Sequence, residues 1–506
     1  SIVLEKVLVE NYAAGGKSLA RRDGKVIFIE SVVPGDVVDV RLSKNKKDFA
    51  EGYPTLFHAY STERVTPFCK HFGVCGGCQW QMLPYQKQLQ YKQQQVWDNL
   101  TRIGKIPLPE MMPIAGADET TFYRNKLEYT FSTREFTTSK PRPRHPEAHL
   151  VPGEKTAAAP AEALVAHTTE ASGLPNDEKF FNGSTQQHEP GSDTPESLHG
   201  GSGAMETLPP GGGALGFHAK GFFDKVVQIE ECWLQPEPTN ALRNALYDYA
   251  VSNNLSFYNF REHKGLLRNL QVRICTTGEV MINLVVGEAD EKKIKNTLAF
   301  IDASFPQITT LLYTINLKWN DSLHDQQPIV YKGKGHVIEK LEDFSFKIGP
   351  KSFFQTNTKQ AEKLYQVTRE FAELNGTQTV YDLYCGTGSI GIFCSSQAKK
   401  IIGVDVVDAA IADANENGIL NNITHASFFS GDVIEVCNTD FFAQHGRPDV
   451  IITDPPRAGM HEKLVHKILE MEAPIVVYVS CNPATQARDL ALLDEHIRRV
   501  QADRLL

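Results

Sequence analysis

One segment reads Val380-Tyr381-Asp382-Leu383-Tyr384-Cys385-Gly386-Thr387-Gly388-Ser389-Ile390-Gly391. This segment places a G-x-G-x-x-G pattern after an apolar run and before a predicted helix. Such a pattern is typical of the loop that connects a buried strand to the following helix. Further strands are predicted at 400–405, 424–429, 449–454 and 474–480, and they alternate with helical or connecting segments. This alternation predicts a doubly wound, mostly parallel α/β sheet with a ligand crevice at the carboxyl ends of its strands.

A helix is predicted just before this sheet, from Thr358 to Leu374, and Asn375-Gly376 ends it. Its apolar residues recur at helical spacing and therefore predict one buried stripe. The stripe is assigned to the core rather than to a ligand site, and it comprises Ala361, Leu364, Tyr365, Thr368, Phe371 and Ala372.

Acidic residues at three strand ends indicate which ligand the crevice holds. The glycine pattern alone, with Gly386 and Gly388, fits a dinucleotide as well. Asp382, however, can accept a hydrogen bond from an ammonium group and would repel a pyrophosphate. Asp405 can hold both ribose hydroxyls, and Asp432 lies where an adenine amino group can be read. These features favour S-adenosylmethionine and a methyltransferase over a nicotinamide-dependent dehydrogenase or an empty crevice.

Two motifs, at the ends of the predicted strands 449–454 and 474–480, indicate the chemistry. Asp454-Pro455-Pro456-Arg457 makes a rigid turn that projects Asp454 into the crevice; N6-adenine methyltransferases use a related turn. Ser480-Cys481-Asn482-Pro483 places a thiol on the adjacent strand. A lone cysteine there is often only packing. Carbon 5 of a pyrimidine, however, needs a nucleophile at carbon 6, whereas exocyclic amines need none. A free thiol is mostly protonated near neutral pH, so we expect the amides of the helix beginning near Pro483 to assist it.

Cysteines also mark a second site. The chain has nine, an odd number that argues against a disulfide framework. Cys69, Cys75 and Cys78 follow one another at short spacing, and Gly76-Gly77 lets the loop curl around an ion or a cluster. Cys232 is the candidate fourth ligand. Zinc is the generic reading of four cysteines, with an iron-sulfur cluster as the alternative.

The 506 residues predict several domains. Residues 1–58 alternate between apolar and polar positions and predict a small β-barrel of the oligonucleotide-binding kind, whose basic residues either follow phosphates or form a solvated face. Residues 59–100 contain the cysteine segment and a helix from Tyr85 to Leu100. Residues 101–345 form a central α+β domain, and residues 346–506 form the sheet described above.

The central domain is interrupted by a segment of different composition. Residues 137–213 are rich in Pro, Gly, Ser, Thr and Glu, with few large apolar side chains, and predict a disordered insertion. The segments Tyr123–Phe131 and 215–218 on either side of it are expected to be strands of one sheet. The net charge is −9, and no apolar run is long enough to span a membrane. We therefore expect a cytoplasmic protein, with a monomer as the simplest state.

Together, the Asp454-Pro-Pro-Arg457 and Ser480-Cys-Asn-Pro483 motifs resemble those of the RNA uracil-5 methyltransferase family. Within that family the chain is most similar to the 23S rRNA branch, which carries a TRAM domain and an iron-sulfur cluster. The resemblance implies an RNA substrate, a TRAM barrel at 1–58 and Cys481 as nucleophile. It implies a four-iron four-sulfur cluster rather than zinc, held by Cys69, Cys75, Cys78 and Cys232. It also implies an S-adenosylmethionine pocket lined by Gln355, Tyr384, Asp405 and Asp454.

One departure from the family bears on turnover. Family members carry a general base, a Glu in a Phe-Pro-x-Thr-x-His-Val-Glu stretch, beyond the nucleophile, and the segment from His496 to Leu506 lacks this motif. We expect a truncated or altered family member that forms a methylated covalent RNA adduct but turns over slowly. The competing hypotheses are methylation of tRNA and a catalytically impaired RNA-binding protein.

Overall fold

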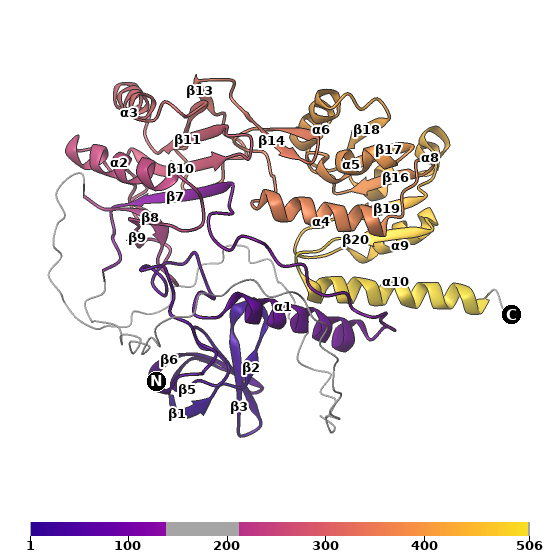
Figure 1. The fold of residues 1–506 in the computed structure, drawn as a ribbon, viewed down its shortest axis with the longest axis horizontal. Helices are drawn as coiled ribbons and strands as arrows, with labels where there is room; N and C mark the ends of the chain where they lie inside the picture. The colour runs from indigo at the N-terminus through magenta and orange to yellow at the C-terminus, as the bar shows by residue number, and fades with distance from the viewer. Residues whose placement is uncertain (1, 138–211, 504–506) are drawn as a thin grey trace, which may run out of the picture. The chain divides into compact units, whose positions relative to one another are not determined.

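The computed structural model describes residues 2–137 and 212–503 (Figure 1). The insertion predicted at 137–213 lies outside these residues apart from its ends. Among the helices in the described ranges, none is both long and apolar enough to cross a membrane.

The amino-terminal strands form one six-stranded sheet in the order β1-β5-β6-β4-β3-β2. Its buried face follows the sequence alternation, since Ile27, Ile29, Val38 and Val40 all point into one core cluster. The edge strands β1 and β2 are consecutive in the chain, but no pairing between them is present in the described part. The predicted closed barrel is therefore not found. The strands are β1 (Val3–Leu8), β2 (Asn11–Tyr12), β3 (Ser18–Arg22), β4 (Lys25–Ile29), β5 (Val37–Asn45) and β6 (Phe49–Ala59).

A helical segment follows the cysteine loop. Helix α1 (Tyr85–Asn99) has nearly the predicted bounds, and a π-helical turn, η2 (Leu100–Gly104), continues it. Both pack against the last helix of the chain, α10 (Pro483–Asp503). A Cβ on Gly104 would lie 3.4 Å from the carbonyl oxygen of Ala487, so the absence of a side chain permits this approach.

The central sheet has seven strands in the order β13-β12-β11-β10-β7-β8-β9. The predicted neighbours either side of the insertion are paired, because β7 and β8 run antiparallel with Thr130 opposite Gly216. Helices α2 and α3 cover the face made of Leu127, Leu270 and Ile282, which leaves the polar side chains on the opposite face. The elements are β7 (Lys126–Ser132), β8 (Ala214–His218), β9 (Val226–Gln228), α2 (Thr239–Ser252), β10 (Leu267–Ile274), β11 (Val280–Val286), α3 (Glu291–Ser304), β12 (Thr310–Ile315) and β13 (Ile329–Lys332).

A hairpin of β14 (Val337–Leu341) and β15 (Phe344–Ile348) leads to helix α4 (Thr358–Phe371). The predicted buried stripe of α4 is only partly correct. Ala361, Tyr365 and Thr368 are buried, but Leu364 and Phe371 are 39% and 51% exposed. The helix thus packs through a narrower face than its apolar residues predict.

The carboxyl-terminal sheet confirms the predicted doubly wound architecture, with five parallel strands in the order β18-β17-β16-β19-β20 (Figure 1). Helices α4, α5 and α6 pack on the face that contains Val380 and Ile401. Helices α7, α8, α9 and α10 pack on the face that contains Tyr381 and Ile402. The elements are β16 (Thr379–Leu383), α5 (Ser389–Cys394), β17 (Lys400–Asp405), α6 (Asp408–Leu420), β18 (Ala426–Ser430), α7 (Val433–Val436), α8 (Thr439–His445), β19 (Val450–Thr453), α9 (Glu462–Met471) and β20 (Ile475–Tyr478).

Candidate active site

The glycine loop after β16 has a conformation that depends on its glycines. Gly386 and Gly388 have φ values of 53° and 75°, in the left-handed region that favours glycine. A Cβ on Gly388 would meet the Phe428 ring at 2.9 Å, whereas a Cβ on Gly386 would meet nothing within 4 Å. The backbone at Gly386 therefore borders open space, where a ligand can approach it closely. Tyr384 also has a positive φ, of 60°, at the start of the turn.

Asp382 lies at the end of β16 and is fully buried. Its Oδ2 accepts a hydrogen bond of 2.8 Å from the amide of Gly391. Its Oδ1 has no partner among the described residues. Leaving a buried carboxylate oxygen unpaired is costly, so this atom is suited to a ligand that donates hydrogen bonds. An ammonium group fits this requirement, as the sequence predicted.

Asp405 and Asp432 follow the next two strands. Asp405 accepts hydrogen bonds of 2.9 Å from the amides of Gly386 and Val407, which fix its orientation at the end of β17. A carboxylate oxygen has a second lone pair, so these bonds leave room for a hydroxyl donor. Asp432 is exposed and accepts a hydrogen bond of 2.8 Å from the amide of Ile434, at the start of α7.

Several acidic groups of the site influence one another electrostatically. Burial, together with the nearby charges of Asp454 and Asp405, raises the pKa of Asp382 to about 7. Burial also raises the pKa of Asp454 to about 6. The pKa of the Tyr384 hydroxyl is raised by burial and by Asp432 and Asp405. The structure thus brings the predicted acidic residues into one region, which favours a positively charged ligand.

Cys481 and Asp454 follow the ends of neighbouring strands. Strands β19 and β20 pair with Thr453 opposite Tyr478, and the amide of Val479 donates to the carbonyl of Thr453 at 2.9 Å. Cys481 is exposed, and it forms no disulfide. Within the described ranges no side chain donates a hydrogen bond to the Asp454 carboxylate. A free thiol and an unpaired carboxylate therefore stand at the same edge of the sheet.

The first amides of helix α10 were expected to assist the Cys481 thiol, but no hydrogen bond between them and the sulfur is present in the described residues. The first amides of this helix do not bond to the thiol, because the amide of Ala484 donates to the side chain of Asn482 at 3.1 Å. Asn482 also donates from Nδ2 to the carbonyl of Arg457 at 3.0 Å. This side chain therefore caps the helix and joins the nucleophile loop to the Asp-Pro-Pro-Arg turn.

A buried carboxylate on α10 completes this connection, and sequence reasoning did not identify it. Oδ2 of Asp489 accepts hydrogen bonds of 2.7 Å from the amide of Met460 and from the hydroxyl of Tyr478. Its Oδ1 accepts from Arg488, whose Nη2 also donates to the carbonyl of Ala458 at 3.0 Å. Asp489 thus holds the Asp454 turn, strand β20 and the nucleophile helix together.

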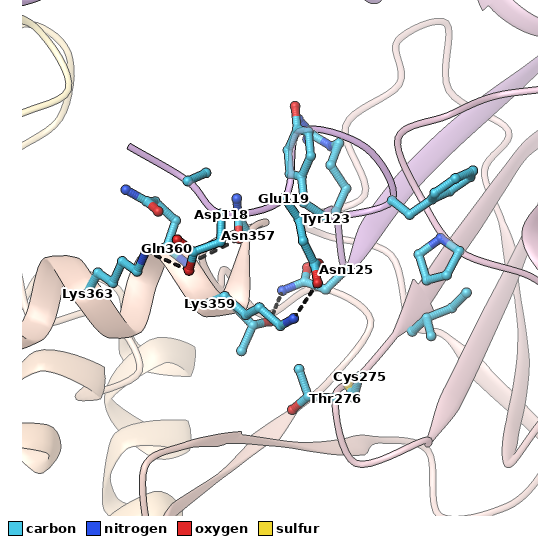
Figure 2. A pocket seen from close by; sticks show the side chains of 16 residues that line it. Asp118, Glu119, Tyr123, Asn125, Cys275, Thr276, Asn357, Lys359, Gln360 and Lys363 are labelled. Atoms are coloured by element: carbon cyan, nitrogen blue, oxygen red, sulfur yellow. Dashed lines mark hydrogen bonds and ion pairs between the residues drawn. The ribbon is translucent and has the colours of Figure 1, made fainter. Parts of the chain in front are cut away.

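Gln355 lies in a loop that is tied to the central sheet. Nδ2 of Asn125 donates to the carbonyl of Gln355 and to the hydroxyl of Thr358, both at 2.8 Å. Figure 2 shows Asn125 at this junction, in a pocket between the central sheet and helix α4. The two lysines of this pocket are paired, since Lys359 pairs with Glu119 and Lys363 pairs with Asp118 (Figure 2). Asn125 was also not identified from the sequence, although it lies in the segment predicted to be a strand.

The four predicted cysteine ligands line one small pocket of about 20 Å³. A Cβ on Gly76 would lie 2.8 Å from the carbonyl oxygen of His218, and the amide of Gly76 donates to that oxygen, so the loop needs glycine here to join the central domain. Burial raises the pKa of Cys75 to about 12 and also raises those of Cys78 and Cys232. The donor type and number fit a cluster. Nevertheless, no group of three or more His, Cys, Asp or Glu in the described residues is close enough to hold a metal ion.

Comparisons with known proteins indicate the family of this chain. The family model described as tRNA (Uracil-5-)-methyltransferase matches residues 334–503. A Bacteroides thetaiotaomicron protein named an uncharacterized RNA methyltransferase is 46% identical over 485 residues, which cover 95% of this chain and 93% of that protein. A protein of the same description from Porphyromonas gingivalis is 41% identical over 96% of this chain and 92% of its own length.

A solved structure shares the fold. It is the Pyrococcus abyssi tRNA (uracil-54, C5)-methyltransferase in complex with S-adenosyl-L-homocysteine. The superposition has a TM-score of 0.65 and covers 97% of this chain and 94% of that chain, at 22% sequence identity. The chain therefore has a fold that a solved methyltransferase also adopts.

Proposed function

This chain belongs to the RNA uracil-5 methyltransferase family, and we propose that it methylates carbon 5 of a uridine through a covalent bond from Cys481. It is an S-adenosylmethionine-dependent RNA methyltransferase. One observation carries the proposed mechanism. An exposed thiol stands at the end of β20, beside the end of β19 where Asp454 enters the acidic region.

The chemistry requires this thiol to act first. The Cys481 sulfur adds to carbon 6 of the uracil, and the electron pair of the C5=C6 double bond moves toward carbon 5 and the carbon 4 oxygen. S-adenosylmethionine, when bound, supplies the electrophilic methyl group that carbon 5 then takes up. Loss of the carbon 5 proton to a base restores the double bond and expels the Cys481 thiolate.

The acidic region would hold the cofactor. The unpartnered Oδ1 of Asp382 would accept from its ammonium group, and Asp405 would accept from the ribose hydroxyls. Asp432 would accept from the adenine amino group. The remaining residues proposed to contact the cofactor are Gln355, Tyr384, Gly386, Gly388 and Asp454.

Cofactor affinity should depend on pH near neutrality. Below pH values of about 7 and about 6, Asp382 and Asp454 take up protons in the protein without ligand. A cation binds better to the ionised carboxylates, so we expect the Kd for S-adenosylmethionine to rise as the pH falls through this window. Titration calorimetry at several pH values measures this. Because both pKa values are raised relative to the unfolded chain, the same ionisation lowers folding stability as the pH rises.

A control variant separates this effect from other titrations. Asp382→Asn removes one of the two protonation sites while keeping an oxygen that can accept from Gly391. Its Kd should be weaker at neutral pH and should change less steeply with pH. A wild-type Kd that stays constant across the window would contradict the assignment of the acidic region to the cofactor.

The first proposed substrate is 23S rRNA, because the cysteine segment and the amino-terminal β domain are similar to those of the rRNA branch. Residues 1–58 would then form a TRAM domain that contacts RNA. A second candidate is tRNA, favoured by two observations. The matching family model describes tRNA enzymes, and the solved structure with the same fold over nearly the whole chain is named as a tRNA methyltransferase.

Mapping the methylated nucleotide tests both candidates. The protein would be incubated with S-adenosylmethionine carrying a labelled methyl group and with total RNA lacking this modification. The proposed function predicts label on carbon 5 of one uridine, in 23S rRNA under the first proposal and in tRNA under the second. Binding of RNA without any incorporation of label would instead support a non-catalytic RNA-binding protein.

We also propose that Cys69, Cys75, Cys78 and Cys232 ligate a four-iron four-sulfur cluster. The support is that all four line the same pocket, although Cys232 is far from the others in sequence. A four-iron four-sulfur cluster needs four thiolate ligands, and its binding would bring these four sulfur atoms together around it.

The cluster proposal predicts the metal content of the purified protein. Protein prepared without oxygen should contain iron and acid-labile sulfide, and Cys75→Ser should lose most of both. Cys437→Ser, at a buried cysteine of the carboxyl-terminal core, is the matched control and should keep them. Wild-type protein that contains zinc in place of iron would reject the cluster.

A further inference from the structure

A second pocket, of about 450 Å³, lies on the polar face of the central sheet. Three cations line it: Arg124, Lys126 and Arg273. Lys126 and Arg273 are direct cross-strand neighbours on β7 and β10. Like charges placed opposite one another on a sheet are destabilising, so their juxtaposition calls for a compensating anion. Among the described residues, none of the three cations forms an ion pair, and the one carboxylate of the lining is Glu128, which is exposed.

Arg273 differs from the other buried arginines of the chain. Arg243 and Arg268 are at most 1% exposed, and each is satisfied. Arg243 donates to a backbone carbonyl at 2.8 Å and to three side-chain oxygens. Arg268 donates to Asp321 and to three backbone carbonyls. Both therefore offset the cost of burying a guanidinium with complete hydrogen bonding.

Arg273 is 3% exposed but lacks these partners. Its Nη1 donates to Asn125 at 3.4 Å and its Nη2 to the carbonyl of Ser352 at 3.5 Å, both long contacts. Its Nε has no partner among the described residues. Burial lowers the pKa of Arg273, and the charge of Glu339 offsets this only in part, since no carboxylate lies at ion-pair distance among the described residues. A buried guanidinium with an unused donor and no ion pair is costly, and it is best explained by an anion that is present when the protein works.

The pocket also offers an aromatic surface. Phe353 is 73% exposed and belongs to the same lining as Arg273. Exposed aromatic rings beside cations are typical of sites that hold single-stranded nucleic acid, where a base stacks while the phosphate is bound. The pocket of Figure 2 shares Arg124 with this lining, but its two lysines, Lys359 and Lys363, are already paired with carboxylates.

We propose that Arg273, with Lys126 and Arg124, binds a backbone phosphate of the substrate RNA next to the nucleotide that is methylated. The inference rests on the proposed function, because it takes the anion to belong to the substrate. The guanidinium supplies directed donors to the phosphate oxygens, and the two neighbouring cations supply charge. The site is a positioning site and takes no part in bond making.

Its test measures RNA affinity as a function of salt. The probe is a short single-stranded RNA with a central uridine, bound to protein saturated with S-adenosyl-L-homocysteine. Arg273→Gln should weaken binding about tenfold, the value of one charged hydrogen bond. It should also reduce the slope of log K against log salt by about 0.7, as for one lost phosphate contact on a single strand. The Kd for S-adenosylmethionine should not change.

Two further variants keep the test decisive. Lys126→Gln, at a half-buried position, should reduce the slope in the same direction and replaces Arg273→Gln if that variant does not fold. Lys359→Gln removes a lysine that is paired with Glu119 in the pocket of Figure 2, and it should leave the slope unchanged. A neutral methylphosphonate placed beside the uridine should weaken wild-type binding and have no further effect on Arg273→Gln.

The inference is overturned if Arg273→Gln and Lys126→Gln bind the RNA with wild-type affinity and slope. It is also overturned if Arg273→Gln loses affinity for the cofactor alone. Either result can occur while the wild type still methylates uridine, so failure of this inference is distinct from failure of the proposed function.

Discussion

Cys481→Ala is expected to lose methyl transfer to uridine by about 10⁴-fold or more, because carbon 5 is then never activated by a bond at carbon 6. Binding of S-adenosylmethionine and of RNA should remain, since Cys481 is exposed and forms no hydrogen bond in the described structure. Incorporation of labelled methyl groups under single-turnover conditions measures the loss. Equilibrium binding of each ligand shows that the remaining site is intact.

A trapped complex makes this result specific. RNA with 5-fluorouridine at the target position carries a fluorine that cannot leave as a proton does, so the wild type should remain covalently attached after methylation. The complex should survive denaturation, and Cys481→Ala should not form it. Cys437→Ala, at a buried cysteine of the same domain, should form the complex as the wild type does. Trapping by the Cys481 variant would place the nucleophile elsewhere.

Asp489→Ala should have the second largest effect, and it should act on both stability and activity. The change leaves the amide of Met460, the hydroxyl of Tyr478 and the guanidinium of Arg488 without their buried acceptor. Loss of one member of a buried charged network costs about 3–5 kcal/mol in the free energy of unfolding. Denaturant titration of the variant measures this cost.

A readout beyond stability tests the positioning role. Under conditions where the variant is folded, Asp489→Ala should form the trapped 5-fluorouridine complex slowly, because the Asp454 turn and the Cys481 loop are no longer held together. Its Kd for S-adenosyl-L-homocysteine should change little. Tyr478→Phe removes only one of the bonds to Asp489 and should have a smaller effect on both quantities. A destabilised variant with a wild-type trapping rate would leave Asp489 with a structural role alone.

The carboxyl-terminal sheet could be predicted from the sequence because its inner strands, β16, β17 and β19, are buried on both faces. Their centres are therefore apolar, as at 401–404, and the helices between the strands allow a parallel order. Acidic residues at strand ends could be located for the same reason, since the ends of parallel strands meet at one edge. Cys232 was proposed from the sequence as the fourth ligand, and the structure places it in the lining of the same pocket as the other three cysteines.

Other features depend on tertiary contacts that no sequence pattern reveals. Leu364 and Phe371 have the helical spacing of core residues, yet both are exposed, because no neighbouring element covers them fully. Asp489 lies on a helix with several other charged residues, and only the structure shows that it faces the Asp454 turn. Arg273 follows the usual alternation of a strand, and no pattern reveals that its Nε lacks an acceptor.

Asn125 gives the molecule a thermodynamic property as well as a structural one. A single amide side chain bonds to the loop of Gln355 on one side and receives Arg273 on the other. The proposed cofactor loop and the proposed RNA phosphate site would therefore meet at one residue. Any factor by which one ligand changes the equilibrium affinity for the other must then be the same in both directions.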